Sequence, residues 1–165
     1  MRILGIDPGT RESGVVLWDS ETVLYRRVQD NYSLRDDLRN GFPVGADVVV
    51  MESMTPYATG YTTMATLLFL GRLFEICDET QRKWYQVTRQ AVVKHITGRA
   101  HAKKPDTRNN DTRVRDALIA RFPATGGGKV PQIGIKAQPG PLYGMATHMW
   151  PALAVAITWF ELEGE

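Results

Sequence analysis

Apolar residues in the first half of the chain occur in short runs separated by polar turns, a pattern that predicts β-strands. The turns between the first three runs are short, which is typical of an antiparallel meander. A fourth run is apolar without interruption, as expected of a central strand covered on both faces. The expected strands are Arg2–Asp7, Ser13–Trp18, Thr22–Val28 and Asp47–Met51, and a helix is expected over Leu34–Asn40.

From Thr62 the apolar spacing changes to that of an α-helix, which is expected to end at Glu79. Thr62 or Thr63 is the candidate N-cap. Apolar side chains occupy nearly the whole circumference of this helix, so more than one of its faces must be covered. We expect the sheet to cover one face and a second subunit another. The pattern therefore predicts a homodimer through helix 62–79, in which Gly71 permits close approach of a neighbour.

The second half of the chain alternates strand, helix and loop patterns. It contains no repeat, so we expect one α/β domain over residues 1–165. The expected elements are a strand at Trp84–Val87, a helix capped by Thr88 that runs through Ile96 and stops at Gly98, a basic loop over residues 99–110, a helix capped by Asp111 that runs to Arg121, a Gly/Pro-rich loop over residues 123–147, and a final apolar helix at Met149–Leu162.

Composition excludes several protein classes. Of the 165 residues, 43% are apolar and 23% are charged, the profile of a globular domain. The longest apolar stretches are too short to span a membrane, and the N-terminus has no signal pattern. We therefore expect a cytoplasmic protein. The single cysteine, Cys77, allows neither an intrachain disulfide nor a cysteine metal cluster, and we expect it to be a small buried hydrophobe.

Positive charge is concentrated in one part of the chain. Residues 82–121 hold 11 Lys or Arg and 3 Asp or Glu, a net charge of +8. The whole chain carries +2, so the remainder carries −6. Two interpretations remain open, a surface for a polyanionic partner and an ordinary solvated helix face.

Two carboxylates stand at the ends of predicted strands. Asp7 ends the first strand and Glu52 follows the apolar run. If these strands are neighbours, both side chains emerge at one sheet edge, where oxygen ligands suit Mg²⁺ or Mn²⁺. Each residue alone also fits a turn or a solvated strand end. His148 begins the last helix and fits either a structural or a functional role, whereas His95 and His101 are expected to face phosphate or solvent.

Four segments together resemble RuvC-type Holliday junction resolvases. These segments are the opening RILGIDPGT (2–10), the run ending at Glu52, the stretch QVTRQAVVKHITG (86–98) with the basic loop and helix that follow, and the ending ATHMWPALAVAITW (146–159). The sequence PGPLYG (139–144) is more similar to phage-encoded members of this family. The opening alone also resembles sugar-kinase and actin-like ATPases, but the order of all four segments does not.

The resemblance implies a ribonuclease H-like α/β fold, a mixed sheet with a three-strand antiparallel meander flanked by helices. It also implies a dimeric endonuclease of DNA recombination and repair that cuts branched DNA by hydrolysis at two Mg²⁺ or Mn²⁺ ions. Asp7, Glu52 and His148 would be the catalytic metal ligands. A fourth family ligand falls at Pro151, which cannot bind a metal. A group elsewhere or water would then take its place, or activity would be weak.

The resemblance also implies a DNA-binding surface, for which the expected residues are Arg99, Lys103, Lys104, Arg108 and Arg113, with Tyr57 and Tyr61 as candidates for stacking on opened bases. Packing at the rim of the loop is an equally open role for the two tyrosines. Two alternative functions remain, a nuclease of structured RNA and a junction-binding protein with little or no activity.

Overall fold

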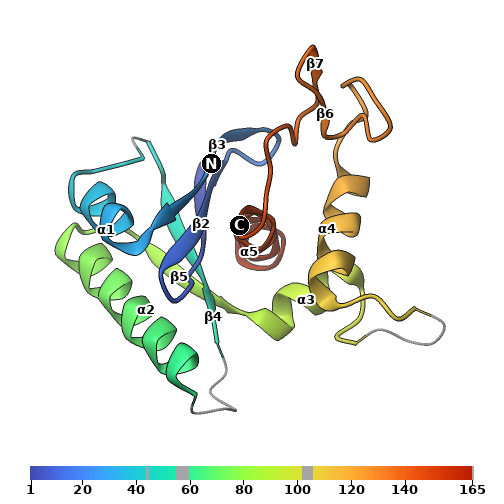
Figure 1. Ribbon diagram of the computed structural model, residues 1–165. Helices are drawn as coiled ribbons and strands as arrows, with labels where there is room; N and C mark the ends of the chain where they lie inside the picture. Colours follow the sequence, from blue (N-terminus) through green and yellow to red (C-terminus); the bar gives the residue numbers. More distant parts are fainter. Residues whose placement is uncertain (44, 55–59, 102–105, 165) are drawn as a thin grey trace.

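The computed structural model describes residues 1–43, 45–54, 60–101 and 106–164 (Figure 1). Five strands form a mixed sheet in the order β3-β2-β1-β4-β5. Antiparallel pairing joins β1 to β2 and β2 to β3, and parallel pairing joins β1 to β4 and β4 to β5. The predicted meander and α/β class are confirmed. The strands are β1 (Ile3–Asp7), β2 (Glu12–Trp18), β3 (Val23–Asp30), β4 (Val48–Ser53) and β5 (Trp84–Thr88).

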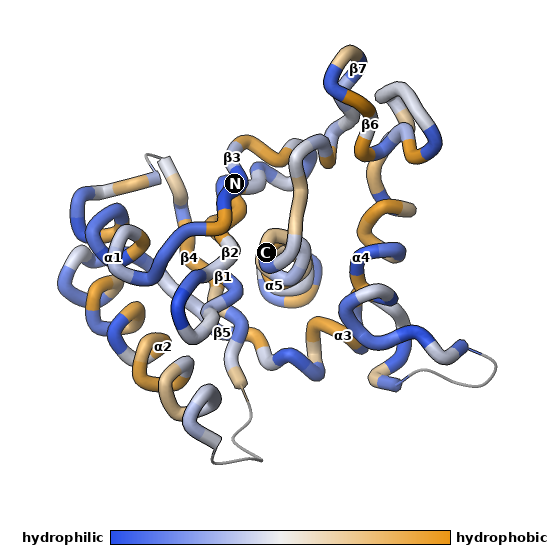
Figure 2. Tube along the Cα trace, viewed as in Figure 1, coloured by the Kyte–Doolittle hydropathy of each residue, from blue (hydrophilic) through white to orange (hydrophobic). Residues whose placement is uncertain are grey.

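Helices cover both faces of the sheet, which explains why β4 is buried along its whole length (Figure 1). On one face lie α1 (Asn31–Arg39) and α2 (Tyr61–Glu79), and on the other lie α3 (Arg89–Thr97), α4 (Asn110–Arg121) and α5 (Met149–Glu163). Two apolar clusters fill the two layers. Figure 2 shows apolar residues along the strands and α5, whereas α1 is largely hydrophilic.

Two strand glycines let α5 approach the sheet unusually closely. A Cβ atom on Gly5 would lie 2.1 Å from the carbonyl oxygen of Ala152, and one on Gly14 would lie 2.0 Å from that of His148. Both distances are far inside van der Waals contact, so only glycine fits there. The N-terminal half of α5 is therefore seated directly on β1 and β2.

Three helix starts differ from the sequence prediction. Helix α1 begins at Asn31 because Asp30 caps it, accepting a hydrogen bond from the backbone N–H of Ser33 at 2.9 Å. Helix α2 begins at Tyr61, after Gly60, and has no side-chain cap. Asn109, not Asp111, caps α4. The predicted cap of α3 by Thr88 is confirmed.

Residues 123–147 are mainly loop, as predicted, but they include a small hairpin of β6 (Gly134–Ile135) and β7 (Gln138–Pro139), which projects from the molecule in Figure 1. Cys77 is fully buried, as expected. Among the described residues, none of the helices combines the length and the apolar character that crossing a membrane would require.

Candidate active site

Asp7 and Glu52 lie on neighbouring strands, which was the condition for both side chains to emerge at one sheet edge. Parallel pairing places Ile6 of β1 opposite Met51 of β4, so the residue that follows in each strand reaches the same edge of the sheet. Both side chains are shielded from solvent, with 14% of the Asp7 side chain and 8% of the Glu52 side chain exposed. The two carboxylates therefore share a partly desolvated environment.

His148 joins this pair from the other end of the chain. Its Nδ1 lies 2.9 Å from Oδ2 of Asp7, across 141 positions of sequence. The close seat of α5 on Gly14 fixes the His148 backbone at this point. The hydrogen bond to Asp7 raises the pKa of His148 above its ordinary value, because the carboxylate favours the protonated ring.

These three side chains open into one cavity of 830 Å³. Glu12, at the start of β2, adds a third carboxylate that sequence reasoning did not find. Tyr61 stands at the rim and is 85% exposed. The cavity is lined by Asp7, Pro8, Gly9, Thr10, Arg11, Glu12, Glu52, Met54, Tyr61, Thr62, Thr63, Thr66 and His148.

Arg89 is a second residue of the site that sequence reasoning missed. Its Nη1 donates to Oε2 of Glu52 at 3.1 Å, and its Nη2 contacts Oδ1 of Asp111. Ser53 pairs with Thr88 across β4 and β5, so Arg89 follows at the strand end beside Glu52. A sequence signal for Arg89 existed, because this arginine directly follows β5, the strand that pairs in parallel with the β4 strand of Glu52.

The environment of Glu52 opposes its negative charge. Burial raises its pKa to about 7; Arg89 counteracts this rise, and the nearby charge of Asp7 adds to it. A carboxylate of this kind is stabilised by a cation placed between it and its neighbour. Perturbed carboxylates in a cavity are typical of functional sites.

Two of the three donors at the site suit a hard divalent cation by type. The carboxylate oxygens of Asp7 and Glu52 are ligands that Mg²⁺ or Mn²⁺ prefers, whereas the imidazole of His148 is a softer nitrogen donor. Among the described residues, no three His, Cys, Asp or Glu side chains are grouped as a ready-made metal site. Instead, Glu52 is bonded to Arg89 and Asp7 to His148. Ion binding would therefore require these carboxylates to exchange partners.

Pro151 lines a neighbouring cavity of 490 Å³ together with Arg89, Asp111 and His148. The carboxylate of Asp111 thus lies near the position where a fourth ligand was expected. Its side chain is 72% exposed and is bound to Arg89. A positive guanidinium therefore stands between Glu52 and the fourth carboxylate of this region.

The expected phosphate contact at Arg113 is wrong, because this side chain is buried. Only 6% of it is exposed, and its guanidinium donates to the side chains of Asn110 and Thr97 and to the backbone oxygen of Arg99. Arg113 holds the start of α4 against the end of α3. Position in a basic stretch did not reveal this structural role.

The rest of the basic stretch is partly neutralised within the chain. Arg108 is 52% exposed but pairs with Asp106 and Asp116, and Nε2 of His95 lies 2.5 Å from Oε2 of Glu161. Arg99 and His101 are exposed. Tyr57, Lys103 and Lys104 lie outside the described residues.

Comparison with known proteins gave no match to a family model and no match to a curated protein. Among the solved structures that match are three that are similar over almost the whole chain. Two are of Thermus thermophilus RuvC, one of them in complex with Holliday junction substrate, and both have a TM-score of 0.65. They are 18% and 19% identical, and the alignments cover 96% and 99% of this chain and 92% and 97% of theirs.

The third is the Fowlpox virus resolvase with Holliday junction DNA, at a TM-score of 0.54 and 12% identity, covering 96% of this chain and 98% of the resolvase. The chain has a RuvC-type resolvase fold. This fold includes the five-stranded mixed sheet and the terminal helix α5 that brings His148 to Asp7.

Proposed function

We propose that this protein is a divalent-metal-dependent endonuclease that cleaves four-way DNA junctions as a homodimer. The observation that carries the proposal is the convergence of Asp7, Glu52 and His148 on one cavity at the sheet edge of a RuvC-type fold. The structural likeness to two resolvases determined with junction DNA supports branched DNA as the substrate.

Asp7, Glu52 and His148 would hold Mg²⁺ or Mn²⁺, and the resemblance implies two ions. The ions would activate water and neutralise charge on the phosphate. The residues of the chain keep the site ordered before substrate arrives: Arg89 balances the buried Glu52, and His148 orients Asp7.

DNA would reach the cavity past Tyr61, which stands exposed at its rim and offers a ring for base stacking. Five further residues remain proposed DNA contacts: Arg99, Arg108, Lys103, Lys104 and Tyr57. For Arg108 such a contact requires release from Asp106 or Asp116. Arg113 is not proposed again.

The dimer would form through the exposed side of α2. Leu70 and Leu73 face the sheet and are buried, whereas Met64 is 47% and Leu68 63% exposed. Exposed apolar side chains on one helix side favour a subunit contact. Twofold symmetry would place two active sites on symmetric strands of a junction.

One alternative is favoured by a specific observation. Pro151 supplies no ligand and Arg89 stands beside Glu52, which fits a protein that binds junctions but cleaves them poorly. Incubation with a labelled four-way junction and Mg²⁺ or Mn²⁺ separates the two functions. We expect cleavage of the junction and none of a linear duplex or an RNA hairpin. Binding without cleavage would support the alternative, and preferential cleavage of RNA would contradict both.

A further inference from the structure

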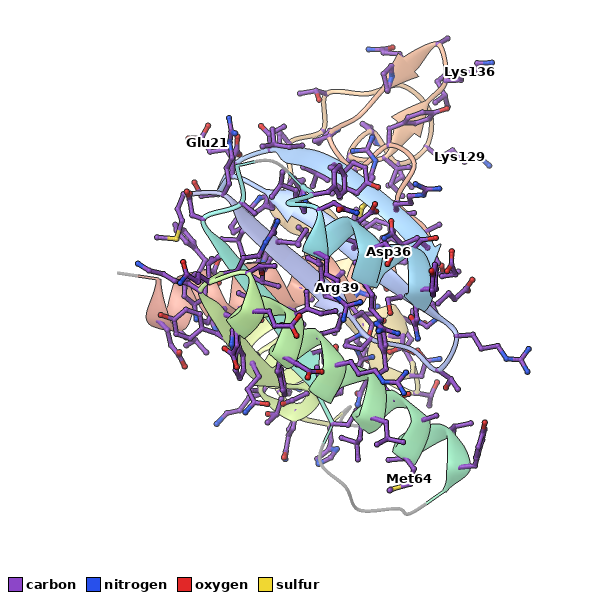
Figure 3. The ribbon with its side chains drawn as sticks, turned by 90° about the vertical axis from the view of Figure 1, so that its left-hand side faces the viewer. Glu21, Asp36, Arg39, Met64, Lys129 and Lys136 are labelled. Carbon is purple, nitrogen blue, oxygen red and sulfur yellow. The ribbon has the colours of Figure 1, made fainter. Side chains whose placement is uncertain are left out.

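Another cavity, of 330 Å³, lies between α1 and α2 on the side of the sheet opposite α5. Figure 3 looks onto this side, with α1 and α2 in front of the strands. Arginines from the two helices face the cavity together: Arg35 from α1 and Arg72 from α2. The cavity is lined by Thr10, Asn31, Tyr32, Arg35, Ala65, Leu68, Phe69 and Arg72, and this lining contains no acidic residue. Leu68 also belongs to the proposed dimer contact, so the cavity lies at the edge of that contact.

These two arginines have no carboxylate partner among the described residues. Arg39, Arg89, Arg108 and Arg121 each pair with a carboxylate. Within the described ranges neither Arg35 nor Arg72 forms an ion pair, and Nε of Arg35 is buried without a hydrogen-bond acceptor. A phosphate bound between the two arginines would offset the repulsion between their positive charges.

The cavity adjoins the catalytic site through one turn. Thr10 lines both cavities. The turn is fixed by Asn31, which donates to the backbone oxygen of Gly9 at 3.0 Å and accepts from the hydroxyl of Ser13 at 2.7 Å. A ligand bound between Arg35 and Arg72 would therefore lie beside the strand end that carries Asp7.

We propose that Arg35 and Arg72 form a binding site for a backbone phosphate of the nucleic-acid strand that enters the active site. The planar guanidinium fork matches phosphate oxygens and binds them through paired hydrogen bonds. The inference rests on the proposed nuclease function and adds a contact on the opposite side of the catalytic cavity from the basic stretch at residues 99–113.

Salt dependence of junction binding tests this site without requiring cleavage. Wild type, Arg35→Gln, Arg72→Gln and the double variant are titrated with junction in EDTA at several salt concentrations. Each phosphate contact contributes about 0.9 to the slope of log affinity against log salt, so each single variant should lose about one unit and the double variant about two. Arg39→Gln is the matched control, because Arg39 lies on α1 (Figure 3) and pairs with Glu79.

Phosphate ethylation interference adds a positional readout. We expect one ethylated phosphate near the cleaved bond to weaken wild-type binding but not binding by the double variant. An unchanged salt slope in folded variants would overturn the site, as would loss of the dimer in Arg72→Gln, which would assign the cavity to the partner subunit. A reduced slope with no cleavage by wild type would retain the phosphate site and reject the nuclease function.

Discussion

Arg89 donates to Glu52 at 3.1 Å and thereby joins the start of α3 to the buried carboxylate of β4. Only 8% of the Glu52 side chain is exposed, and burial raises its pKa to about 7, so removal of Arg89 would favour the protonated, neutral carboxyl. The cation is thus part of what allows Glu52 to be charged in the folded protein.

Replacement of Arg89 by Met should lower the free energy of unfolding by less than about 1 kcal/mol at pH 7, because Glu52, whose pKa is already about 7, then takes up a proton; the loss should grow by up to about 1.4 kcal/mol for each pH unit above 7. Adding Glu52→Gln should recover a large part of this loss, because no charge then remains unpaired. Urea denaturation of the four proteins gives the coupling energy. Additive effects of the two substitutions would show that the pair is not coupled.

Substitution of Gly14 by Ala should displace the first turn of α5, because the new Cβ would meet the carbonyl oxygen of His148 at 2.0 Å. Both stability and any metal-dependent cleavage should fall sharply. Gly60→Ala is the matched control, since a Cβ there meets no atom of the described residues within 4 Å and φ is −72°. Equal stability and equal cleavage in the two variants would argue against close packing of the His148 backbone on Gly14 of β2.

Paired Glu substitutions at Met64 and Leu68 should convert the proposed dimer to a monomer, because both exposed side chains would place charge in the contact. Leu70 is unsuitable for this test, since it is only 4% exposed and faces the sheet. Light scattering at micromolar concentration measures the outcome. A wild-type monomer, or a double variant that remains dimeric, would reject this surface.

Glu161 links α5 to α3 and α4 through His95 and Arg121. Burial alone would raise the pKa of Glu161, but hydrogen bonds from His95 and Arg121 outweigh it and lower the pKa. The contribution of Glu161 to the free energy of unfolding is therefore fully present at pH values above the ordinary pKa of a glutamate. It is lost as the pH falls through the lowered pKa of the folded protein. Glu161→Gln should reduce stability by up to about 1 kcal/mol at pH 7. By pH 2 the variant and the wild type should have the same free energy of unfolding. A difference that stays constant from pH 7 to pH 2 would contradict a role for the charge of Glu161.

Most of the fold could be predicted from the sequence because each strand is marked by its own apolar run. The two carboxylates could be predicted because each stands at the end of such a run. Apolar runs placed β1 and β4 correctly, and Asp7 and Glu52 followed from their ends. The contact between Asp7 and His148 depends on how α5 crosses the sheet, which the glycines at positions 5 and 14 decide. No local sequence pattern predicts how α5 crosses the sheet.

The errors came from charged residues whose partners are distant in the fold. Arg113 reads as one more basic residue of a solvated stretch, yet it is buried against Thr97 and Asn110. Arg89 belongs to the same basic stretch but turns toward Glu52, 37 positions away. The charge pattern of the sequence gives the net charge of such a stretch, but it does not show which residue each arginine contacts in the fold.

The most direct test of the proposed function compares wild type with Asp7→Asn on a labelled four-way junction with Mg²⁺ or Mn²⁺. Asparagine preserves the size of the side chain but removes the charge that would hold the ion. Cleavage under single-turnover conditions and binding in EDTA are measured on the same preparations. The proposed function predicts symmetric cuts by wild type, none by Asp7→Asn, and equal junction affinity. Cleavage by Asp7→Asn at more than a few per cent of the wild-type rate would contradict it.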